Sequence, residues 1–376
     1  MHVYNKCKYL VKKGINTTVL NPHYPGEKFH ETLDGIEIIR FPYFIPFQLQ
    51  KVAYNFGLIQ NIKKSILAKA QLPLFFFMFL LYGLIHVKKK SIIHAHWFPA
   101  GLIGVLIKKI FGNKLVLMMH HAHKPNFLYK YILKNTDVLF ANSSYVLTKT
   151  NKIYKVKNSK VLPVPIDYNI FQPQNDTSDI RQKLNIPVNS IFVFTAGRFI
   201  SLKGFEYLTE AMNIIVNEYG KRDILLRIAG QGPLKEKYLE LIQNLKLEGY
   251  VKLIGYVPNT KINKYYNEAD IFVIPSIIDE NEETEGFGVV SLEANACGTP
   301  VIASKVGGIV DVIEDGYNGY LVEQKSSEQI AKKIVKLAED KELREEMGAN
   351  GRKKVTEEFC WNRITNEVIK IYNDIT

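Results

Sequence analysis

The chain has 376 residues, 47% of them hydrophobic, which is enough apolar material to bury two separate domain cores. Its three cysteines show neither CxxC nor Cys/His spacing, so neither a disulfide framework nor a zinc site is predicted. The formal charge of +12 is unevenly spread: residues 1–170 carry 24 Lys/Arg against 6 Asp/Glu, and residues 171–376 carry 25 against 31. The basic first half predicts attraction to an anionic partner such as a membrane surface, with a solvated lysine-rich face as an equal alternative. It contains no nucleic-acid-binding module, so no nucleic-acid partner is expected.

The first residues predict a helix and not a signal peptide. Apolar residues between positions 3 and 11 fall on one helical face that ends at Gly14, and no apolar segment with a small-residue cleavage site is present. The longest apolar run, 72–87, is interrupted by Pro73 and Gly83 and flanked by lysines. It is shorter than the roughly 20 residues that span a bilayer. We therefore expect a buried core helix, with a helix on a membrane surface as the second interpretation.

Short apolar strands alternate with helical stretches, a pattern typical of parallel sheets covered on both faces. In the first half, strands are predicted at 16–20, 37–40, 91–95, 114–119, 138–141 and near 160–163. The proline-containing segment 163–176 predicts an interdomain linker. In the second half, strands are predicted at 191–196, 225–229, 251–254, 271–275, 300–303 and 319–322, with helices that include 205–218 and 326–338. The fold class is α/β with two doubly wound domains, whose ligands bind at the carboxyl ends of the strands.

Segment 283–304 combines an acidic, glycine-containing loop with a helix from about Gly288. Gly286 and Gly288 leave backbone N–H groups at a helix N-terminus free to face a phosphate or sugar hydroxyls. Glu285 lies in the loop, whereas Glu293 lies more than one turn into the helix. One carboxylate can then face a sugar while the other reaches a ribose. Each residue alone would be an ordinary solvated acid, but the composite segment favours binding.

A second cluster, AGRFISLKG at 196–204, directly follows a predicted strand. It delivers Arg198 and Lys203 into a loop before a helix, where two cations can meet a diphosphate. Surface cations are the usual alternative, but the position after a strand favours binding. The chain has no GxGxxG after a strand with an acid about 20 residues on, so a dehydrogenase is excluded.

Together these segments resemble the retaining family 4 glycosyltransferases, or glycosyl transferases group 1, of the GT-B fold. In that fold two Rossmann-like, doubly wound domains face each other across a cleft. The similarity runs from Gly197 through LLRIAGQGPLKE, VKLIGYVP, EGFGVVSLE and ASKVGGIVDVIEDGYNGYLV. It implies a metal-independent hexosyltransferase without cofactor that moves a sugar from a nucleotide-sugar donor to a glycan, glycolipid or lipid-linked acceptor with retention of configuration. Polysaccharide or cell-envelope biosynthesis is the expected setting.

The resemblance also assigns roles to individual residues. Arg198 and Lys203 would bind the donor pyrophosphate and Glu293 the ribose, while Glu285 with the backbone of Gly286 to Gly288 would meet the sugar and its phosphate. The implied catalytic residues are His120, Arg198, Lys203 and Glu285, and the implied donor-binding residues are Gly230, Gly232, Tyr256, Val257, Gly286, Phe287, Gly288, Val289 and Glu293.

Two histidine-bearing segments, IIHAHW at 92–97 and LVLMMHHAH at 115–123, resemble strand ends of the family's acceptor domain. His120 falls where the family has the histidine that contacts the transferred sugar. His121 and His123 depart from the family pattern, which commonly has Gly and Asp there. His94 and His96 are interpreted as a structural pair at a strand end.

Family members begin with a strand and a glycine-rich loop before their first helix, and both are missing here. We expect a truncated reading frame, whose sheet would leave neighbouring strand edges unpaired. The alternative function is a catalytically impaired nucleotide-sugar-binding protein. The expected domains are 1–168 on the acceptor side and 169–357 for the donor, with a terminal helix 358–376 that packs back on the first domain. The expected location is cytoplasmic, peripheral at the inner face of the cell membrane.

Overall fold

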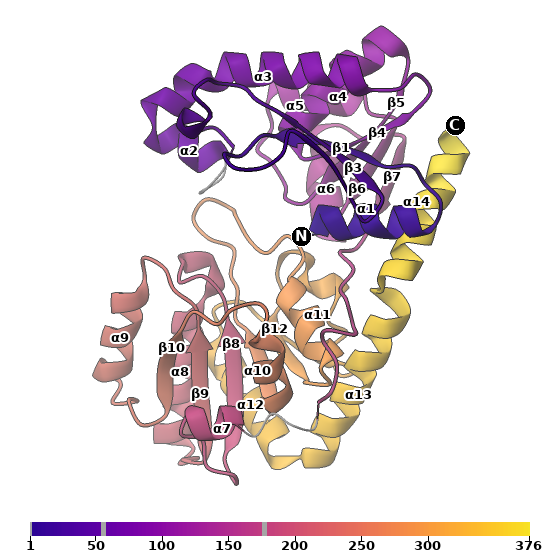
Figure 1. Ribbon diagram of the computed structural model, residues 1–376. Helices are drawn as coiled ribbons and strands as arrows, with labels where there is room; N and C mark the ends of the chain where they lie inside the picture. The colour runs from indigo at the N-terminus through magenta and orange to yellow at the C-terminus, as the bar shows by residue number, and fades with distance from the viewer. Residues whose placement is uncertain (1, 54–57, 175–178) are drawn as a thin grey trace.

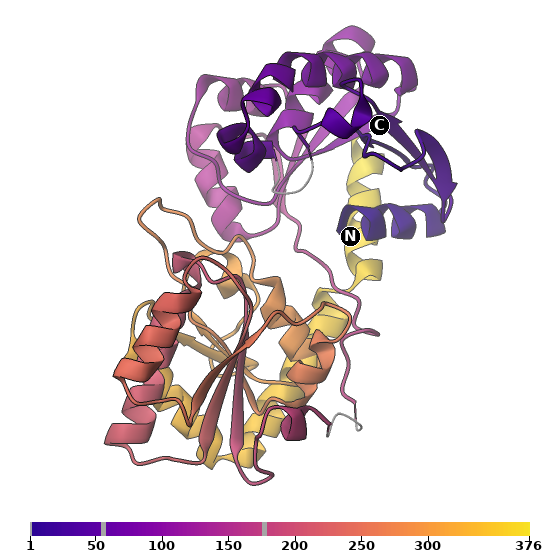
Figure 2. The same cartoon turned by 60° about the vertical axis from the view of Figure 1, so that its left-hand side comes forward.

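The computed structural model describes residues 2–53, 58–174 and 179–376. Figure 1 shows two α/β lobes, one above the other, joined by an extended linker and by two long helices that run along one side. Figure 2, turned by 60°, shows the same separation into lobes. The α/β class predicted from the alternation of strands and helices is confirmed.

The elements of the N-terminal lobe follow in chain order: α1 (His2–Lys12), β1 (Thr18–Pro22), β2 (His30–Leu33), β3 (Ile36–Phe41), η1 (Phe47–Leu49), α2 (Leu58–Lys64), α3 (Ile66–His86), β4 (Ile92–His96), α4 (Phe98–Phe111), β5 (Lys114–Met119), α5 (Phe127–Lys134), β6 (Val138–Ala141), α6 (Ser144–Ile153) and β7 (Asn158–Val161). The predicted strands are found within two residues of their expected ends, whereas β2 is an additional strand that the sequence analysis missed.

The elements of the C-terminal lobe are α7 (Asp179–Lys183), β8 (Ile191–Ala196), η2 (Ser201–Lys203), α8 (Phe205–Asn213), η3 (Ile214–Glu218), β9 (Ile224–Ala229), α9 (Lys235–Asn244), β10 (Val251–Gly255), α10 (Ile262–Glu268), β11 (Ile271–Ile274), α11 (Val289–Ala296), β12 (Val301–Ser304), η4 (Gly307–Asp311), β13 (Gly319–Val322), α12 (Ser327–Glu339), α13 (Lys341–Glu358) and α14 (Trp361–Ile375). The predicted helix 205–218 divides into α8 and a π-helical turn, η3.

The N-terminal lobe holds a four-stranded parallel sheet in the order β4-β5-β6-β7. Alternate residues of β5 face opposite sides, as the two-residue period of a strand requires. Leu115, Leu117 and Met119 pack in a core with α4 and α5. Val116 and Met118 pack on the other face with residues of α1 and α14. The terminal helix therefore completes the core of the first lobe.

A separate three-stranded sheet has the order β1-β3-β2, in which β3 pairs parallel with β1 and antiparallel with β2. Helix α1 covers one face through Cys7. Helix α3 covers the other face, where Phe75 packs with Phe41 and Tyr43. Among the described residues, β1 and β4 each form the edge of their own sheet.

The six strands of the C-terminal lobe are all parallel, in the order β10-β9-β8-β11-β12-β13. One face is buried under α7, α10 and α11, and the other under α8, α9 and α12. From β8 the chain winds outward to β9 and β10 and then returns to place β11 on the other side of β8. The winding therefore reverses between the paired strands β8 and β11, and such a point opens a crevice at the carboxyl ends of the strands.

The segment predicted to be a buried helix is only partly buried. Helix α3 is continuous through Pro73, and of its described residues only Ala68, Gln71, Phe75 and Gly83 are buried. The expectation of a core helix over 72–87 is therefore wrong: one side of the run packs on the lobe, partly buried residues such as Phe79 and Tyr82 flank that side, and the remaining side is exposed.

The two lobes are tied together by the linker and the terminal helices. Arg352 on α13 donates hydrogen bonds to the carbonyls of Tyr168 and Phe171 in the linker, at 2.8 and 2.7 Å. Trp361, at the start of α14, stacks on Tyr9 of α1 with ring centroids 5.4 Å apart. The last two residues of the predicted linker, 175 and 176, lie outside the described residues.

Candidate active site

The loops that follow β8, β9 and β10 pack backbone against backbone at one edge of the second sheet. The N–H of Gly230 donates to the carbonyl of Gly255 at 2.8 Å. A Cβ at Gly230 would lie 1.9 Å from the carbonyl oxygen of Gly197, and its φ of +145° also favours glycine. Gly232 approaches the backbone of Phe199 in the same way. These glycines therefore form a side-chain-free floor at the carboxyl ends of the strands.

Two of the predicted donor-binding residues follow β10 on the same edge. The side chain of Tyr256 is 62% exposed, whereas Val257 is buried against the lobe's core. The exposed ring lies where a flat ligand could stack on it.

Lys203 and Glu285, both predicted site residues, form an ion pair across the reversal point between β8 and β11. Lys203 ends η2 after β8, and Glu285 lies in the loop after β11. The stem of Lys203 lies over Gly197, where a Cβ would meet its Cε at 3.2 Å. Ser276 donates to Oε1 of Glu285 at 3.2 Å, and the Lys203 and Glu285 side chains are only 17% and 15% exposed. The pair is thus held in a fixed, partly dehydrated position. The side chain of Arg198, two residues after the end of β8, is exposed.

The loop that carries Glu285 is fixed by two consecutive glycines at the start of η4. The N–H of Gly308 donates to the carbonyl of Glu285 at 3.0 Å. A Cβ on Gly307 would lie 2.0 Å from that carbonyl oxygen, and one on Gly308 would lie 2.2 Å from the carbonyl oxygen of Gly286. Gly288, with φ +79°, then begins α11. The predicted residues Glu285 to Val289 are therefore positioned by direct backbone contact.

Glu293 lies on α11 but is held by α10 and not by the Lys203–Glu285 pair. Tyr266 of α10 donates its hydroxyl to Oε2 of Glu293 at 2.9 Å. Burial raises the pKa of Glu293 to about 7. The two glutamates of this segment therefore have different neighbours, as their positions in the sequence predicted.

The N-terminal lobe contributes His120, which directly follows β5. A Cβ on Gly286 would lie 2.5 Å from the His120 carbonyl oxygen and 3.2 Å from Nδ1 of His121. Asn142 Nδ2 donates to the same His120 carbonyl at 2.9 Å. The predicted histidine and the glycine loop are thus brought together across the boundary between the lobes. His121, which differs from the family pattern, lies there as well.

Three histidines form a stack that leads inward from this boundary. Rings of His94 and His96 lie 4.8 Å apart, and rings of His96 and His120 lie 5.6 Å apart. His96 Nδ1 and His120 Nε2 are 3.3 Å apart, a hydrogen-bond distance. Burial lowers the pKa of His120 to about 4, so its imidazole is neutral near pH 7. It can exchange hydrogen bonds with a ligand without carrying charge.

The sequence analysis missed two partners of this stack. Lys6 of α1 lies with Nζ 3.4 Å from Nε2 of His94, and Tyr372 of α14 contacts Nδ1 of the same ring. Burial lowers the pKa of Lys6 to about 7. Because these residues come from opposite ends of the chain, no local motif could have indicated them. His123, further along, packs against the rings of Phe98 and Tyr129.

A second unpredicted contact joins the lobes beside the glycine loop. The backbone N–H and the hydroxyl of Ser144 each donate to the carboxylate of Asp311, at 2.5 Å. Ser144 begins α6 of the first lobe and Asp311 ends η4 of the second. A carboxylate at a helix N-terminus is favourable, so this contact stabilises the observed approach of the lobes.

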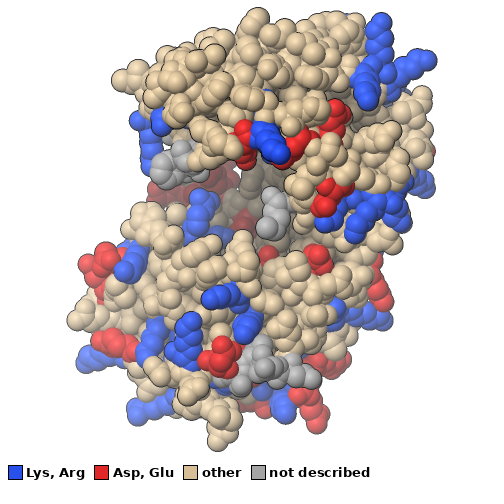
Figure 3. Space-filling model, viewed as in Figure 1, with Lys and Arg blue, Asp and Glu red and all other residues tan. Residues whose placement is uncertain are grey.

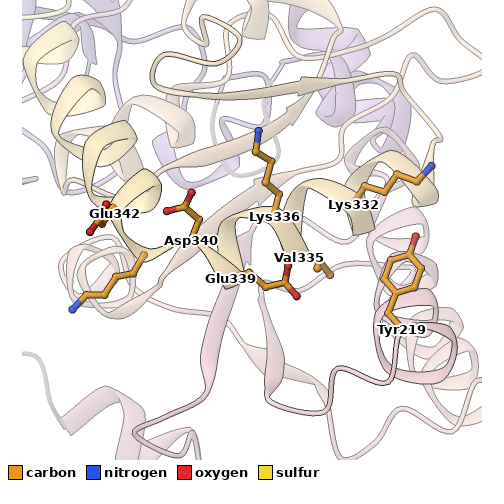
Figure 4. A pocket seen from close by; sticks show the side chains of 8 residues that line it. Tyr219, Lys332, Val335, Lys336, Glu339, Asp340 and Glu342 are labelled. Carbon is orange, nitrogen blue, oxygen red and sulfur yellow. The ribbon is translucent and has the colours of Figure 1, made fainter.

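A second hollow, also in the C-terminal lobe, is lined mainly by charged side chains. Figure 4 shows it on the outer side of α12 near the start of α13, lined by charged side chains of both signs that include Lys332, Lys336 and Glu339. Its lining residue Tyr219 precedes β9, so the hollow lies toward the amino ends of the strands, opposite the glycine floor. Within the described residues, no group of three or more His, Cys, Asp or Glu is arranged to hold a metal ion.

Comparisons with known proteins agree with this geometry. Residues 1–169 match the model of Glycosyltransferase Family 4, and residues 176–354 match that of Glycosyl transferases group 1. The chain is 28% identical over 297 residues to N-acetyl-alpha-D-glucosaminyl L-malate synthase of Bacillus anthracis, with 76% of this chain and 75% of that protein covered.

Two solved structures share the fold. Sucrose-phosphate synthase of Thermosynechococcus elongatus superposes with a TM-score of 0.80 at 22% identity, covering 100% of this chain and 92% of that one. HepE of Anabaena in complex with UDP superposes with a TM-score of 0.74 at 19% identity, covering 96% and 100%. These likenesses confirm the predicted GT-B architecture. The two family models together span nearly the whole chain, which belongs to the group 1, family 4 glycosyltransferases.

Proposed function

We propose that this glycosyltransferase takes a sugar from a nucleotide-sugar donor and transfers it, with retention of anomeric configuration and without a metal ion, to a glycan, glycolipid or lipid-linked acceptor. The observation that carries the proposal is the Lys203–Glu285 pair, fixed at the reversal point of the sheet directly beside the Gly286–Gly308 contact. Ligands of doubly wound folds bind at such a point. UDP-sugars are the first donors to test, because HepE binds UDP.

The arrangement of the side chains supports one direction for the donor. The nucleoside would lie toward Tyr256 and Glu293, which are connected through α10, the helix that follows the Tyr256 loop. The diphosphate would lie toward Arg198, Lys203 and the N-terminus of α11, which favour negative charge. The sugar would then reach Glu285 and the boundary with the first lobe.

The proposed chemistry breaks the bond between the anomeric carbon and the diphosphate oxygen. Negative charge grows on the departing diphosphate, and the cations of Arg198 and Lys203 with the N-terminus of α11 stabilise it. The acceptor hydroxyl attacks the anomeric carbon from the same face, and its proton passes to the departing phosphate oxygen. Neutral His120 hydrogen-bonds the transferred sugar. This route gives retention without a second catalytic carboxylate, unlike retaining glycosidases.

The test is a turnover assay with UDP-, GDP- and ADP-sugars in the presence of EDTA, followed by NMR of the anomeric proton in the released sugar or transfer product. We expect nucleotide release from one donor type, with the donor's anomeric configuration kept. Loss of turnover in EDTA would overturn metal independence, and an inverted product would overturn retention. Tight donor binding without release under any acceptor condition would support the alternative of a catalytically impaired binding protein.

A further inference from the structure

Helix α3 exposes an unbroken apolar stripe on the outside of the N-terminal lobe. Figure 1 places the helix along the top of the lobe, on the side away from the second lobe, and Figure 3 shows the front of this top as a broad tan surface with blue Lys or Arg side chains at its right-hand edge. Ile66, Phe77 and Ile85 are 85%, 60% and 63% exposed. Scattered exposed apolar residues are normal, but a continuous stripe marks a contact surface.

The spacing of the exposed residues confines the stripe to one side of the helix. Exposed apolar residues recur every three or four positions, at Ile66, Ala70, Pro73, Leu74, Phe77, Leu81 and Ile85. Residues at this spacing share one helical face. The 19 steps from Ile66 to Ile85 correspond to a stripe about 28 Å long.

The opposite side of α3 is fixed to the lobe. Phe75 is buried with Phe41 and Tyr43. A Cβ on Gly83 would lie 2.6 Å from Cδ1 of Ile107, so α3 and α4 are in direct contact at this end. Ile110, one turn further along α4, is also 58% exposed. The helix is therefore held lengthwise on the lobe, with its apolar face turned outward.

Charge indicates what covers the stripe. Residues 38–136 contain 14 Lys/Arg and no Asp or Glu. Exposed lysines stand at both ends of α3, at Lys63, Lys64, Lys69, Lys88, Lys89 and Lys90. A surface that is apolar in the middle and cationic at its ends is complementary to anionic headgroups over an acyl phase. Nucleic acid offers no apolar phase for the stripe, and a second copy would bring like charges together.

We propose that α3 docks the N-terminal lobe on an anionic phospholipid bilayer, with the stripe in the headgroup–acyl boundary and the flanking lysines on the headgroups. By length and composition α3 could also cross a membrane. Crossing would strip Phe75 and Gly83 from their packing against β3 and α4, whereas docking keeps both contacts. The surface is separate from the donor residues, so this inference goes beyond the proposed transfer reaction.

The test is flotation of the full chain with vesicles of phosphatidylcholine alone and of phosphatidylcholine with phosphatidylglycerol. We expect binding to the anionic vesicles at low salt and weaker binding at high salt. The triple variant Lys88→Gln, Lys89→Gln, Lys90→Gln should weaken binding on the order of 100-fold, from about fivefold for each lysine at an anionic surface. A wash with alkaline carbonate should release the bound protein.

The stripe itself is tested by the double variant Phe77→Glu, Leu81→Glu, with Val188→Glu as a matched control. Val188 is 88% exposed in the other lobe, so its variant should bind vesicles as the wild type does. The double variant should lose vesicle binding but keep the wild-type Tm and nucleotide-sugar binding, which separates this proposal from that of the donor site.

Three outcomes would overturn the proposal. In the first, the double variant binds anionic vesicles as strongly as the wild type does. In the second, the wild-type protein stays on the membranes after the carbonate wash. In the third, the wild-type protein does not bind anionic vesicles at low salt. Self-association that the double variant abolishes, or nucleic-acid binding in place of vesicle binding, would reassign the surface to those partners.

Discussion

Gly308→Ala should damage transfer far more than folding. The added Cβ would lie 2.2 Å from the carbonyl oxygen of Gly286 and 2.6 Å from Cβ of Ser143, whereas Cβ atoms essentially never approach another heavy atom within 3.0 Å. Both neighbours are held by backbone, so the loop that carries Glu285 must move by about 0.8 Å, the difference between 2.2 and 3.0 Å. Overpacking of this kind costs about 1–3 kcal/mol. For a lobe of this size, that corresponds to a fall in Tm of roughly 2–12 °C.

A displacement near 1 Å at a reacting group can lower the rate about 100-fold. We therefore expect the variant to stay folded and to release nucleotide from the donor about 100-fold more slowly, measured beside thermal melts. Gly249→Ala is the control, because a Cβ there would meet nothing within 4 Å. Wild-type turnover in Gly308→Ala would refute the conclusion that this contact positions the site.

Further changes probe the electrostatics and the packing. Burial raises the pKa of Glu293 from 4.5 to about 7. Between these two pH values the folded chain keeps a proton that the unfolded chain loses, so the stability of the fold falls as the pH rises from one to the other. Glu293→Gln should therefore gain Tm relative to wild type as pH rises from about 5 to about 8, and an equal difference at both pH values would contradict this. The guanidinium of buried Arg227 donates hydrogen bonds to backbone carbonyls, so Arg227→Met should lower the free energy of unfolding in urea by about 3 kcal/mol. The control is exposed Arg222→Met, which should lower it by about 0.5 kcal/mol or less. Equal losses in the two variants would count against a role for these bonds. Trp361 is 4% exposed and stacks on Tyr9, so Trp361→Ala should lower the free energy of unfolding by about 3–5 kcal/mol. A loss below about 1 kcal/mol would show that this side chain does not hold α14 in place.

Local pattern was sufficient for most of the sheets. The buried parallel strands, such as 114–119 and 191–196, are short apolar runs bounded by loop residues, and both were predicted with their observed ends. Strand β2 was missed because its residues are mostly exposed and show no apolar alternation. A signal was nevertheless present: Asp34 and Gly35 have φ of +50° and +77°, as expected for an Asp-Gly turn between hairpin strands.

The burial of α3 could not be read from its sequence. The run is apolar around the whole helix, so periodicity cannot distinguish the side that packs from the side that is exposed. Its burial is decided by the size of the surface that β3 and α4 offer, which is a tertiary property.

The candidate site was predictable in part. Lys203 and Glu285 were identified by their positions after strands. Their pairing depends on β8 lying next to β11 in the sheet, and this spatial order is known only from the structure. Contacts across the lobes, such as Ser144 with Asp311, depend on how two separately folded units meet. The stack of histidines gains Lys6 and Tyr372 for the same reason.

The most direct test of the central claim is calorimetric titration of UDP-, GDP- and ADP-sugars, in EDTA, into the wild-type chain and into Lys203→Ala and Glu293→Ala. Lys332→Ala, at the hollow near the amino ends of the strands, is the control. If the donor binds at the reversal point of the second sheet, one nucleotide type will bind the wild-type and control proteins, and binding will be lost or strongly weakened in both site variants. Unchanged binding in Lys203→Ala and Glu293→Ala, or no nucleotide-sugar binding by folded protein, would contradict the assignment of the donor site.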